Sequence, residues 1–484
     1  MKKFLLFICF PILLSAQVTP PKPCGPVPSQ RQLAWRDIGF YAFVHFTTNT
    51  FRNVEWGYGD ASPNDFNPEK LNCEQWVKTF KSAGMKGVII TAKHHDGFCL
   101  WPSKLTDYSV KNSKWRNGQG DVVRELSLAA HKYGLQMGVY LSPWDRHEER
   151  YGTPAYLDYY RGQLHELLSN YGPIFEVWQD GANGGDGYYG GKKEKRIIDS
   201  KTYYEWAVTD SLIRQLQPNA CIFGDGGPDA RWCGTESGYV GDPNWCLITK
   251  NNYAPGHADP NNLQHGEEQG SDWVPAEVDV SIRPGWFYHD TENDKIKTVQ
   301  QLLDIFYNSI GRGSNLILNV PADKDGLLHA NDVERLQEFG DALQKEFQNN
   351  LNSQIASVKA SNVRGNSRRY AARKVIDASN NTYWATNDRI HQASLTFKFK
   401  KSIILNRFYV REYIQLGQRV KAFKLELQNA NGDWEQIATA STIGNKRILR
   451  FNDIETKTLR FTITDCKACP VISDIRFYCA PIIQ

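Results

Sequence analysis

Short apolar runs alternate with stretches of helical spacing over roughly the first 350 residues. Residues 174–178 form one such run, interrupted only by Glu176 and ending before Gln179 and Asp180, which is typical of a buried strand. Residues 73–84 instead place Trp76, Phe80 and Ala83 at helical intervals. We expect strands at 38–46, 85–93, 136–142, 174–180, 220–224, 277–283 and 314–320, and helices at 73–84, 122–133, 156–170, 201–216 and 331–347. This alternation, without an internal repeat, predicts a parallel α/β fold.

Polar or aromatic side chains follow most of the expected strands. His45, His94, Asp145 and Asp180 each stand where an apolar run ends. A (β/α)8 barrel gathers side chains from all of its strands at one rim, whereas a doubly wound sheet concentrates them at one switch point. The spread of polar strand ends therefore favours an α/β chain with a (β/α)8-like barrel, which we assign to residues 17–348.

The pattern changes near residue 350. A polar linker at 348–353 is followed by short alternating runs separated by turns such as the one at 429–432. We expect strands at 393–399, 406–412, 423–428, 458–464 and 471–477. This pattern predicts an all-β sandwich domain over residues 349–484.

The first residues resemble a secretory signal peptide. Lys2 and Lys3 precede an apolar stretch at 4–14, and Ala16 offers a small residue for cleavage. We therefore expect a signal peptide at 1–16 and an exported protein, periplasmic or secreted. No later stretch approaches ~20 consecutive apolar residues, so we expect no membrane span.

Charge and cysteine content exclude some partners and leave one question open. The formal net charge of +4 implies neither a nucleic-acid nor a membrane-surface partner. One of the ten cysteines, Cys9, lies in the expected leader, so an odd number remains. Cys466 and Cys469 have no second pair to complete a zinc site, and we expect either a local disulfide or unpaired small hydrophobic residues there.

The expected barrel rim combines carboxylates, histidines and aromatic rings, a mixture that suits sugars. Its members are His45, Glu55, Trp56, His94, His95, Tyr140, Trp144, Trp178, Asp180, Glu236 and Trp286. No phosphate-binding glycine motif is present. Adjacent strand residues such as His94 and His95 point to opposite faces, so we predict hydrogen bonding to a polyol there, and neither a metal site nor a cofactor.

Two carboxylates that flank one bond are the basic machinery of glycoside hydrolysis. Asp180, short and fixed at a strand end, suits the nucleophile. Glu236 lies in a glycine-containing segment near Trp232 and suits the acid/base, whose pKa apolar neighbours would raise. The sequence leaves Glu55, Glu176 and Asp225 open as alternatives.

Four separated motifs resemble the retaining α-L-fucosidases of glycoside hydrolase family 29. They are 43–46 with 55–57, 93–98, 178–181 and 279–289, in order along residues 25–345. The resemblance implies a (β/α)8-like barrel, no cofactor, and release of L-fucose from fucosylated oligosaccharides or glycoconjugates through a covalent intermediate on Asp180. It also implies fucose contacts by His45, Glu55, Trp56, His94, His95, Tyr140 and Trp178, with Trp286 in the wall near the sugar methyl group.

The segment around Glu236 resembles the branch that cleaves α-1,3/1,4-linked fucose. Thr235 stands where that branch has Asn, and the interval of 56 residues between Asp180 and Glu236 is long. The glycine- and lysine-rich insertion at 184–196 accounts for the extra length, and we expect the 181–191 loop to be a mobile element of the rim.

The C-terminal region is similar to discoidin-type (coagulation factor 5/8 C-like) carbohydrate-binding modules. The similarity rests on 375–377, 383–386 and 475–477. We expect Trp384 to be a core residue rather than a platform for sugar. Two other functions stay open at this point: a non-catalytic fucose- or glycan-binding protein, and a barrel glycosidase for another sugar. The oligomeric state is not set by the sequence.

Overall fold

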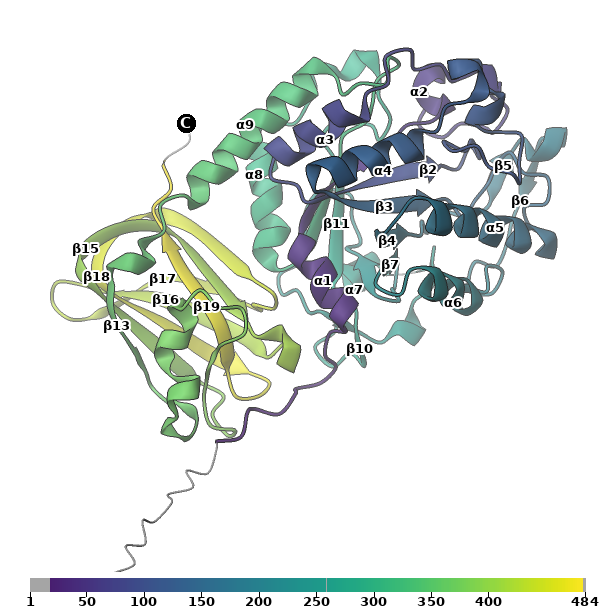
Figure 1. The fold of residues 1–484 in the computed structure, drawn as a ribbon. Coiled ribbons are helices and arrows are strands. Elements are labelled where there is room, and N and C mark those ends of the chain that lie inside the picture. The colour runs from purple at the N-terminus through teal and green to yellow at the C-terminus, as the bar shows by residue number, and fades with distance from the viewer. Residues whose placement is uncertain (1–17, 258, 482–484) are drawn as a thin grey trace, which may run out of the picture.

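The computed structural model describes residues 18–257 and 259–481. The predicted signal peptide at 1–16 lies outside these residues. The described chain forms a helix-covered barrel, followed by an antiparallel β domain that lies against the α8 and α9 side of the barrel (Figure 1). The predicted fold class is therefore confirmed.

Eight parallel strands close the barrel, in the order β1-β12-β11-β8-β7-β4-β3-β2. They are β1 (Phe40–Val44), β2 (Gly87–Lys93), β3 (Gln136–Leu141), β4 (Ile174–Trp178), β7 (Cys221–Gly224), β8 (Ala230–Trp232), β11 (Ala276–Ser281) and β12 (Asn315–Asn319). Most of their residues are buried on both faces, because the helices cover the outside and side chains fill the interior.

Seven of these strands lie where the apolar runs predict them, and the eighth, β8, was not predicted. It has only three residues, preceded by the glycine-rich turn at 224–228. Such a segment is too short for a hydrophobic period to be read from it. The strand matters because the chain continues from it to Glu236.

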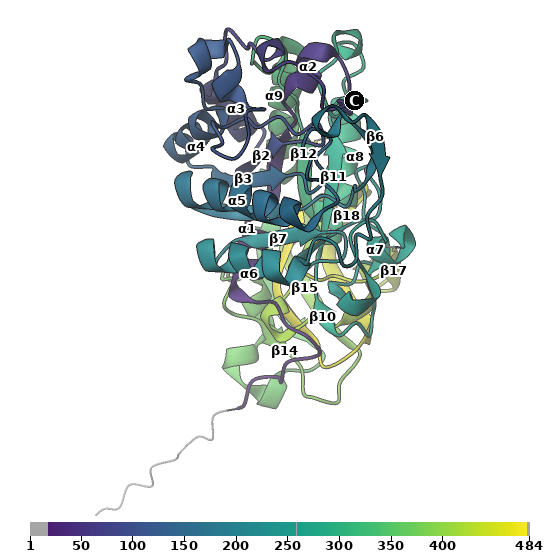
Figure 2. The ribbon, with the colours of Figure 1, turned by 90° about the vertical axis from the view of Figure 1, so that its right-hand side faces the viewer.

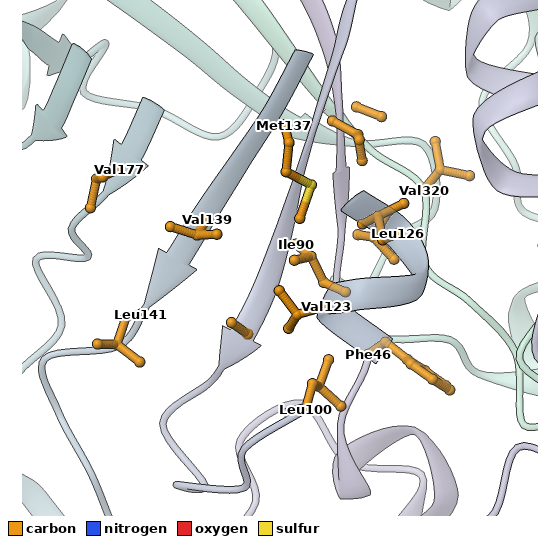
Figure 3. Packing of buried hydrophobic residues seen from close by; sticks show 14 of the residues in the cluster. Phe46, Ile90, Leu100, Val123, Leu126, Met137, Val139, Leu141, Val177 and Val320 are labelled. Atoms are coloured by element: carbon orange, nitrogen blue, oxygen red, sulfur yellow. The ribbon is translucent and has the colours of Figure 1, made fainter. Parts of the chain in front are cut away.

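The helices pack around the barrel. They are α1 (Gln30–Ile38), α2 (Thr48–Arg52), α3 (Cys73–Ser82), α4 (Val122–Tyr133), α5 (Pro154–Asn170), α6 (Trp206–Leu216), α7 (Pro260–His265), α8 (Val299–Asn308) and α9 (Ala330–Phe347). On α4, Asp121 caps the first turn and Gly134 ends the last one in a left-handed conformation. Val123 and Leu126 of this helix then face Ile90 of β2 (Figure 3).

Helix α6 begins five residues later than predicted. Residues 199–204 form turns instead, because the Asp199 carboxylate accepts hydrogen bonds from the Lys201 amide and the Thr202 hydroxyl. The 184–196 insertion, which overlaps the 181–191 loop, contains a small hairpin of β5 (Gly185–Gly187) and β6 (Glu194–Arg196), which faces the viewer in Figure 2. The Arg146 guanidinium donates to the Asp186 carbonyl at 2.6 Å, so this predicted mobile loop is tied to the barrel.

The C-terminal domain is one antiparallel sheet built on two strands of 20 residues each, β15 (Ala393–Glu412) and β18 (Arg447–Cys466). Register shifts divide the pairing of β15 with β18 into two segments. The second part of β15 also pairs with β19, and the last part of β18 also pairs with β16. The other strands are β13 (Ile355–Ala360), β14 (Trp384–Ala385), β16 (Val420–Gln428), β17 (Trp434–Ala440) and β19 (Val471–Tyr478). Trp384 is fully buried in this domain, which confirms its predicted place in the core.

A pair of short strands and an N-terminal strap complete the described structure. Strands β9 (Leu247–Ile248) and β10 (Asp272–Trp273) pair beside the barrel. The strap, residues 18–29, crosses the β domain before α1, and the Arg364 guanidinium donates to the Thr19 carbonyl at 2.6 Å. The N-terminal strap is therefore hydrogen-bonded to the C-terminal domain.

The cysteines of the described residues carry free thiols, including Cys466 and Cys469, which are buried. Of the two expectations for this pair, the unpaired hydrophobic one holds. Within 18–257 and 259–481, no helix is both long and apolar enough to cross a membrane.

Candidate active site

A pocket of about 250 Å³ opens at the carboxyl ends of the barrel strands. Ten of the eleven rim residues predicted from the sequence line it: His45, Glu55, Trp56, His94, His95, Tyr140, Trp178, Asp180, Glu236 and Trp286. The eleventh, Trp144, does not line the pocket, and its indole donates to the Tyr189 hydroxyl at 3.0 Å instead. Closure of the barrel brings the ten lining residues together, because every parallel strand ends at the same rim. The pocket has room for about one sugar ring.

Asp180 is held in a fixed orientation two residues after β4. Its Oδ2 accepts a hydrogen bond from the Tyr140 hydroxyl at 2.9 Å, and its Oδ1 accepts one from the Ala182 amide at 2.7 Å. The His95 Nε2 atom lies 3.7 Å from Oδ2. These contacts aim a short carboxylate into the pocket.

The three pocket histidines are buried, and burial favours the neutral form of each ring. Burial lowers the pKa of His45 to about 3, although its Nδ1 lies 2.8 Å from the Asn319 amide oxygen. Burial also lowers the pKa of His94 well below its usual value, and that of His95. A neutral imidazole can both donate and accept a hydrogen bond, which suits the hydroxyl groups of a sugar.

Trp178 forms the floor of the pocket. Its ring stacks on Phe223 with centroids 4.2 Å apart, and its Nε1 donates to the Glu277 carboxylate at 2.8 Å. Burial, and then the charge of Glu277, raise the pKa of Glu176 well above its usual value. A buried polar network inside the barrel therefore fixes the indole from below.

Glu236 lies at the pocket mouth, four residues after β8. Its Oε2 accepts a hydrogen bond from the Trp286 indole at 3.2 Å. Burial raises the pKa of Glu236, and the negative charges of Asp180 and Glu55 add to this, while the Trp286 contact opposes it. The side chain is thus a carboxyl group biased toward its protonated form.

Glu55 holds the loop that carries Trp286. Its Oε2 accepts from the Trp286 amide at 2.9 Å, and its Oε1 accepts from the Phe287 amide at 3.1 Å. His289 Nε2 lies 2.6 Å from the same Oε1. Both oxygens of Glu55 are therefore already engaged.

Glu176 and Asp225, the other two carboxylates that the sequence left open as alternatives, lie in different places. Glu176 is fully buried inside the barrel, where it accepts from the Trp35 indole, and it does not line the pocket. Asp225 does line the pocket and accepts from the Gly256 amide at 2.7 Å. Burial, with the charge of Asp180, raises the pKa of Asp225 to about 6.

The sequence suggested Trp232 only as an apolar neighbour of Glu236, and it assigned no role to three further lining residues, namely Phe43, Asp279 and Phe287. The Trp232 indole donates to Asp279 at 2.9 Å, and burial and the charge of Glu236 raise the pKa of Asp279 well above its usual value. Asp279 and Phe287 fall inside the motif at 279–289, which could have revealed them. Trp232 depends on the unpredicted strand β8.

The part of the chain that the structure describes contains no group of three His, Cys, Asp or Glu side chains placed to hold a metal ion. His94 and His95 do not point to opposite faces as expected, because β2 ends at Lys93 and both rings line the pocket, with centroids 4.1 Å apart and planes tilted by 44°. His95 Nδ1 lies 2.7 Å from the Ser142 hydroxyl, a contact of the kind that orients a ring for hydrogen bonding.

Two family models match successive parts of the chain. Residues 27–347 match the family model described as alpha-L-fucosidase, and residues 357–473 match the F5/8 type C domain. The chain is 44% identical to Alpha-L-fucosidase 1 of Arabidopsis thaliana over 486 residues, which cover 98% of this chain and 93% of that protein.

Two crystal structures are similar over nearly the whole chain. A glycoside hydrolase 29 family member from an unknown rumen bacterium is 45% identical with a TM-score of 0.85, and the match covers 96% of this chain and 79% of that one. A Ruminococcus gnavus GH29 fucosidase in complex with fucose is 32% identical with a TM-score of 0.85, covering 96% and 98% of the respective chains.

Proposed function

This chain belongs to the α-L-fucosidase family of glycoside hydrolases, which release fucose from fucosylated glycans, and from this premise we propose a retaining, exo-acting mechanism. Asp180 is the nucleophile and Glu236 is the acid/base. The observation that carries the proposal is the opposite environment of the two carboxyls in one pocket: Asp180 accepts two hydrogen bonds, while burial raises the pKa of Glu236.

In the first step Asp180 attacks the anomeric carbon while Glu236 gives its proton to the departing oxygen. In the second step Glu236 accepts a proton from water, the water attacks the same carbon, and the bond to Asp180 breaks. L-Fucose leaves with retained configuration. The hydrogen bond from Tyr140 keeps Asp180 oriented while the bond forms.

We assign the sugar contacts to His45, Glu55, Trp56, His94, His95, Tyr140, Trp178 and Trp286. The neutral imidazoles suit the hydroxyl groups, and the indole rings suit the apolar face and the methyl group of fucose. A pocket of about 250 Å³, closed below by Trp178, supports binding of a single terminal residue, which is the meaning of exo-acting.

The alternative acid/base residues are less suitable. Glu55 already accepts from two backbone amides and contacts His289, so its carboxylate is committed to the Trp286 loop. Glu176 does not line the pocket. The Asp225 carboxylate lies next to Gly181, and it accepts a hydrogen bond from the Gly256 amide.

Replacement of each carboxylate tests the mechanism. Asp180→Ala should abolish hydrolysis of an aryl α-L-fucoside, with a loss of about 10⁴-fold or more in kcat and an unchanged circular dichroism spectrum. Glu236→Ala should regain turnover when azide is added and the leaving group is good. If Glu55→Ala responds to azide instead, the acid/base role belongs to Glu55.

We propose that the preferred substrates carry α-1,3- or α-1,4-linked fucose, on the resemblance of the segment around Glu236. The insertion that lengthens the interval to Glu236 is folded into the β5–β6 hairpin. A panel of α-1,2-, α-1,3-, α-1,4- and α-1,6-fucosylated oligosaccharides checks this. We expect at least about tenfold higher kcat/KM for the α-1,3 and α-1,4 members, and faster cleavage of the α-1,2 or α-1,6 members would refute the preference.

We also propose that the enzyme is exported, to the periplasm or outside the cell, with cleavage after Ala16. The charged start and apolar core of the leader support this. The mass of the mature chain from the producing cell checks it, because an intact Met1 start would contradict export.

A further inference from the structure

The segment that carries Glu236 connects the pocket to the C-terminal domain. We call residues 233–246 the acid/base segment. It leaves β8 at Trp232, passes Glu236 at the pocket mouth, and ends just before β9. A chain of this length reaches up to about 20 Å from Glu236 to Asp242. Its far end touches the other domain.

The pocket end of the segment is held by local contacts. The Thr235 hydroxyl donates to the Ser237 hydroxyl at 3.0 Å, and Glu236 accepts from the Trp286 indole. Ser237 is exposed, and Glu236 is exposed as a whole residue although its carboxyl end is partly buried at the pocket mouth. The conformation here depends strongly on where the rest of the segment is fixed.

The middle of the segment is attached to the barrel. The Val240 amide donates to the Asn308 carbonyl at 3.0 Å, and the Val240 carbonyl accepts from the Arg312 guanidinium at 2.8 Å. Asn308 ends α8, whose Asp304 side chain accepts from Arg450 of the C-terminal domain at 2.7 Å. The barrel attachment is thus itself in contact with the second domain.

The far end of the segment is attached to the C-terminal domain by buried hydrogen bonds. Gln418 donates from Nε2 to the Asn244 carbonyl at 2.9 Å and accepts from the Cys246 amide at 2.7 Å. The Thr442 hydroxyl accepts from the Asn244 amide at 2.9 Å. Gln418 is only 1% exposed. Buried backbone groups need partners, and here side chains of the second domain supply them.

An ion pair adds to these hydrogen bonds. Arg447 contacts the Asp242 carboxylate, which also accepts from the Ser441 hydroxyl. Arg447, as hydrogen-bond donor and as positive charge, holds the pKa of Asp242 below its usual value against the effect of burial. The charged form of Asp242 is therefore favoured in the folded protein, where it pairs with Arg447.

We propose that the C-terminal domain has a catalytic support function: by fixing the far end of the acid/base segment, it positions Glu236 over the leaving oxygen. Gln418, Thr442 and Arg447 are positioning residues for this purpose. The inference rests on the proposed role of Glu236. It gives the β domain a task that does not require it to bind sugar.

The fucose-binding side of the pocket does not depend on this attachment. Trp178 is the last residue of β4, Asp180 lies two residues after it, and His45 directly follows β1. Each of these two strands is hydrogen-bonded to its own neighbours in the closed barrel. Loosening the acid/base segment should therefore weaken proton transfer to the leaving group and leave fucose binding unchanged. A general loss of folding would affect both.

The test compares two fucosyl donors with leaving groups of different quality. A fucosyl disaccharide needs protonation of its leaving oxygen, whereas α-L-fucosyl fluoride needs little. For Gln418→Leu and for the milder Arg447→Gln, we expect kcat/KM on the disaccharide to fall about tenfold and that on the fluoride to change less than about twofold. The Kd of L-fucose, measured by calorimetry, should stay the same.

Glu346→Gln provides a matched control. Glu346 of α9 accepts from the Arg407 Nε of the C-terminal domain at 2.6 Å, and it has no contact with the acid/base segment. This variant weakens a buried contact between the two domains without touching residues 233–246. We expect both substrates to be cleaved within about twofold of the parent rate.

Equal losses on both substrates, or an unchanged disaccharide rate in Gln418→Leu and Arg447→Gln, would overturn the inference. If Gln418→Leu does not fold, Arg447→Gln decides. The variant Glu236→Ala distinguishes failure of this inference from failure of the proposed mechanism. If Glu236→Ala loses the disaccharide selectively while the two positioning variants do not, only the inference fails; if Glu236→Ala keeps normal disaccharide turnover, the acid/base assignment fails as well.

Discussion

The hydrogen bond from the Trp286 indole opposes the other influences on Glu236. Burial and the charges of Asp180 and Glu55 raise the pKa of this carboxyl, whereas the indole stabilises the carboxylate form and lowers it. A general acid must be protonated before it can act, so kcat/KM falls as the pH rises through the pKa of Glu236 in the free enzyme. Trp286 therefore helps to set the alkaline limit of activity.

Trp286→Phe should move this limit upward. Removing the donor takes away the one contact that favours the carboxylate, so Glu236 stays protonated to higher pH. The measurement is the pH profile of kcat/KM on an aryl α-L-fucoside, where the alkaline midpoint should rise even if the maximal rate falls. An unchanged or lowered midpoint would argue that another group controls the alkaline limb.

At the scale of residues, the sequence predicted the pocket better than the connections within it. Each of the ten predicted side chains that line the pocket lies in an expected strand, in one of the quoted motifs or in the segment around Glu236, and a barrel brings such residues together at its rim. The commitment of Glu55 to the backbone of the Trp286 loop could not be predicted, because Trp286 and Glu55 are far apart in the chain. Such contacts depend on the fold.

At the scale of elements, one buried ion pair connects the end of β11 to α9. The Arg283 Nε atom lies 3.1 and 2.9 Å from the two carboxylate oxygens of Asp332, in the first turn of α9. Both side chains are fully buried. Arg283 lies two residues after β11 and three before Trp286, so this pair also anchors the base of the loop that contacts Glu236.

Arg283→Met should destabilise the protein strongly. Removing one partner leaves an uncompensated carboxylate in the interior, at a cost of about 3–5 kcal/mol in the free energy of unfolding. Urea unfolding followed by tryptophan fluorescence measures it. The control is Glu338→Gln on the exposed side of α9, where the pair with Arg335 should be worth less than about 1 kcal/mol. Similar midpoints for the two variants would contradict the role of the buried pair.

The elements that the sequence did not predict include short ones such as β8, but also the ten-residue helix α8, which was missed although Val299, Leu302, Leu303 and Phe306 stand at helical intervals. Strand β8 has three residues, and its neighbour Asp229 is held by Arg31 of α1 and by Arg214 of α6, contacts that no local pattern encodes. By contrast, β2 and β4 follow directly from their apolar runs. The 20-residue strand β15 was predicted as two strands, because residues 400–402 between them are polar.

At the scale of the whole molecule, the two domains are connected at separate places, by the N-terminal strap and by the acid/base segment. Strap residue Cys24 donates its amide to the Leu416 carbonyl of the β domain, and the strap then leads into α1. In α1, the Gln32 side chain donates to the carbonyls of Asp229 and Trp273 at 2.9 and 2.7 Å. The strap thus connects the β domain to the base of β8, while Gln418 holds the segment after it.

The sequence predicted two domains with a linker near residue 350, but it could not predict how closely they interact. A composition change shows where one pattern ends, and it carries no information on which side chains cross the boundary. The contacts of Gln418, Arg447 and Arg407 are long-range and depend on both domains being folded. The support function proposed for the C-terminal domain is visible only at this scale.

Trapping of the glycosyl-enzyme intermediate tests the central claim most directly. A fluorinated fucosyl fluoride, in which fluorine slows both steps while the good leaving group preserves the first, should accumulate the covalent species. Peptide mass spectrometry of the inactivated protein then identifies the labelled residue. We expect one fucosyl group per chain, attached to Asp180. A label on Asp225 or Glu55, or release of fucose with inverted configuration in the NMR spectrum of the first product, would contradict it.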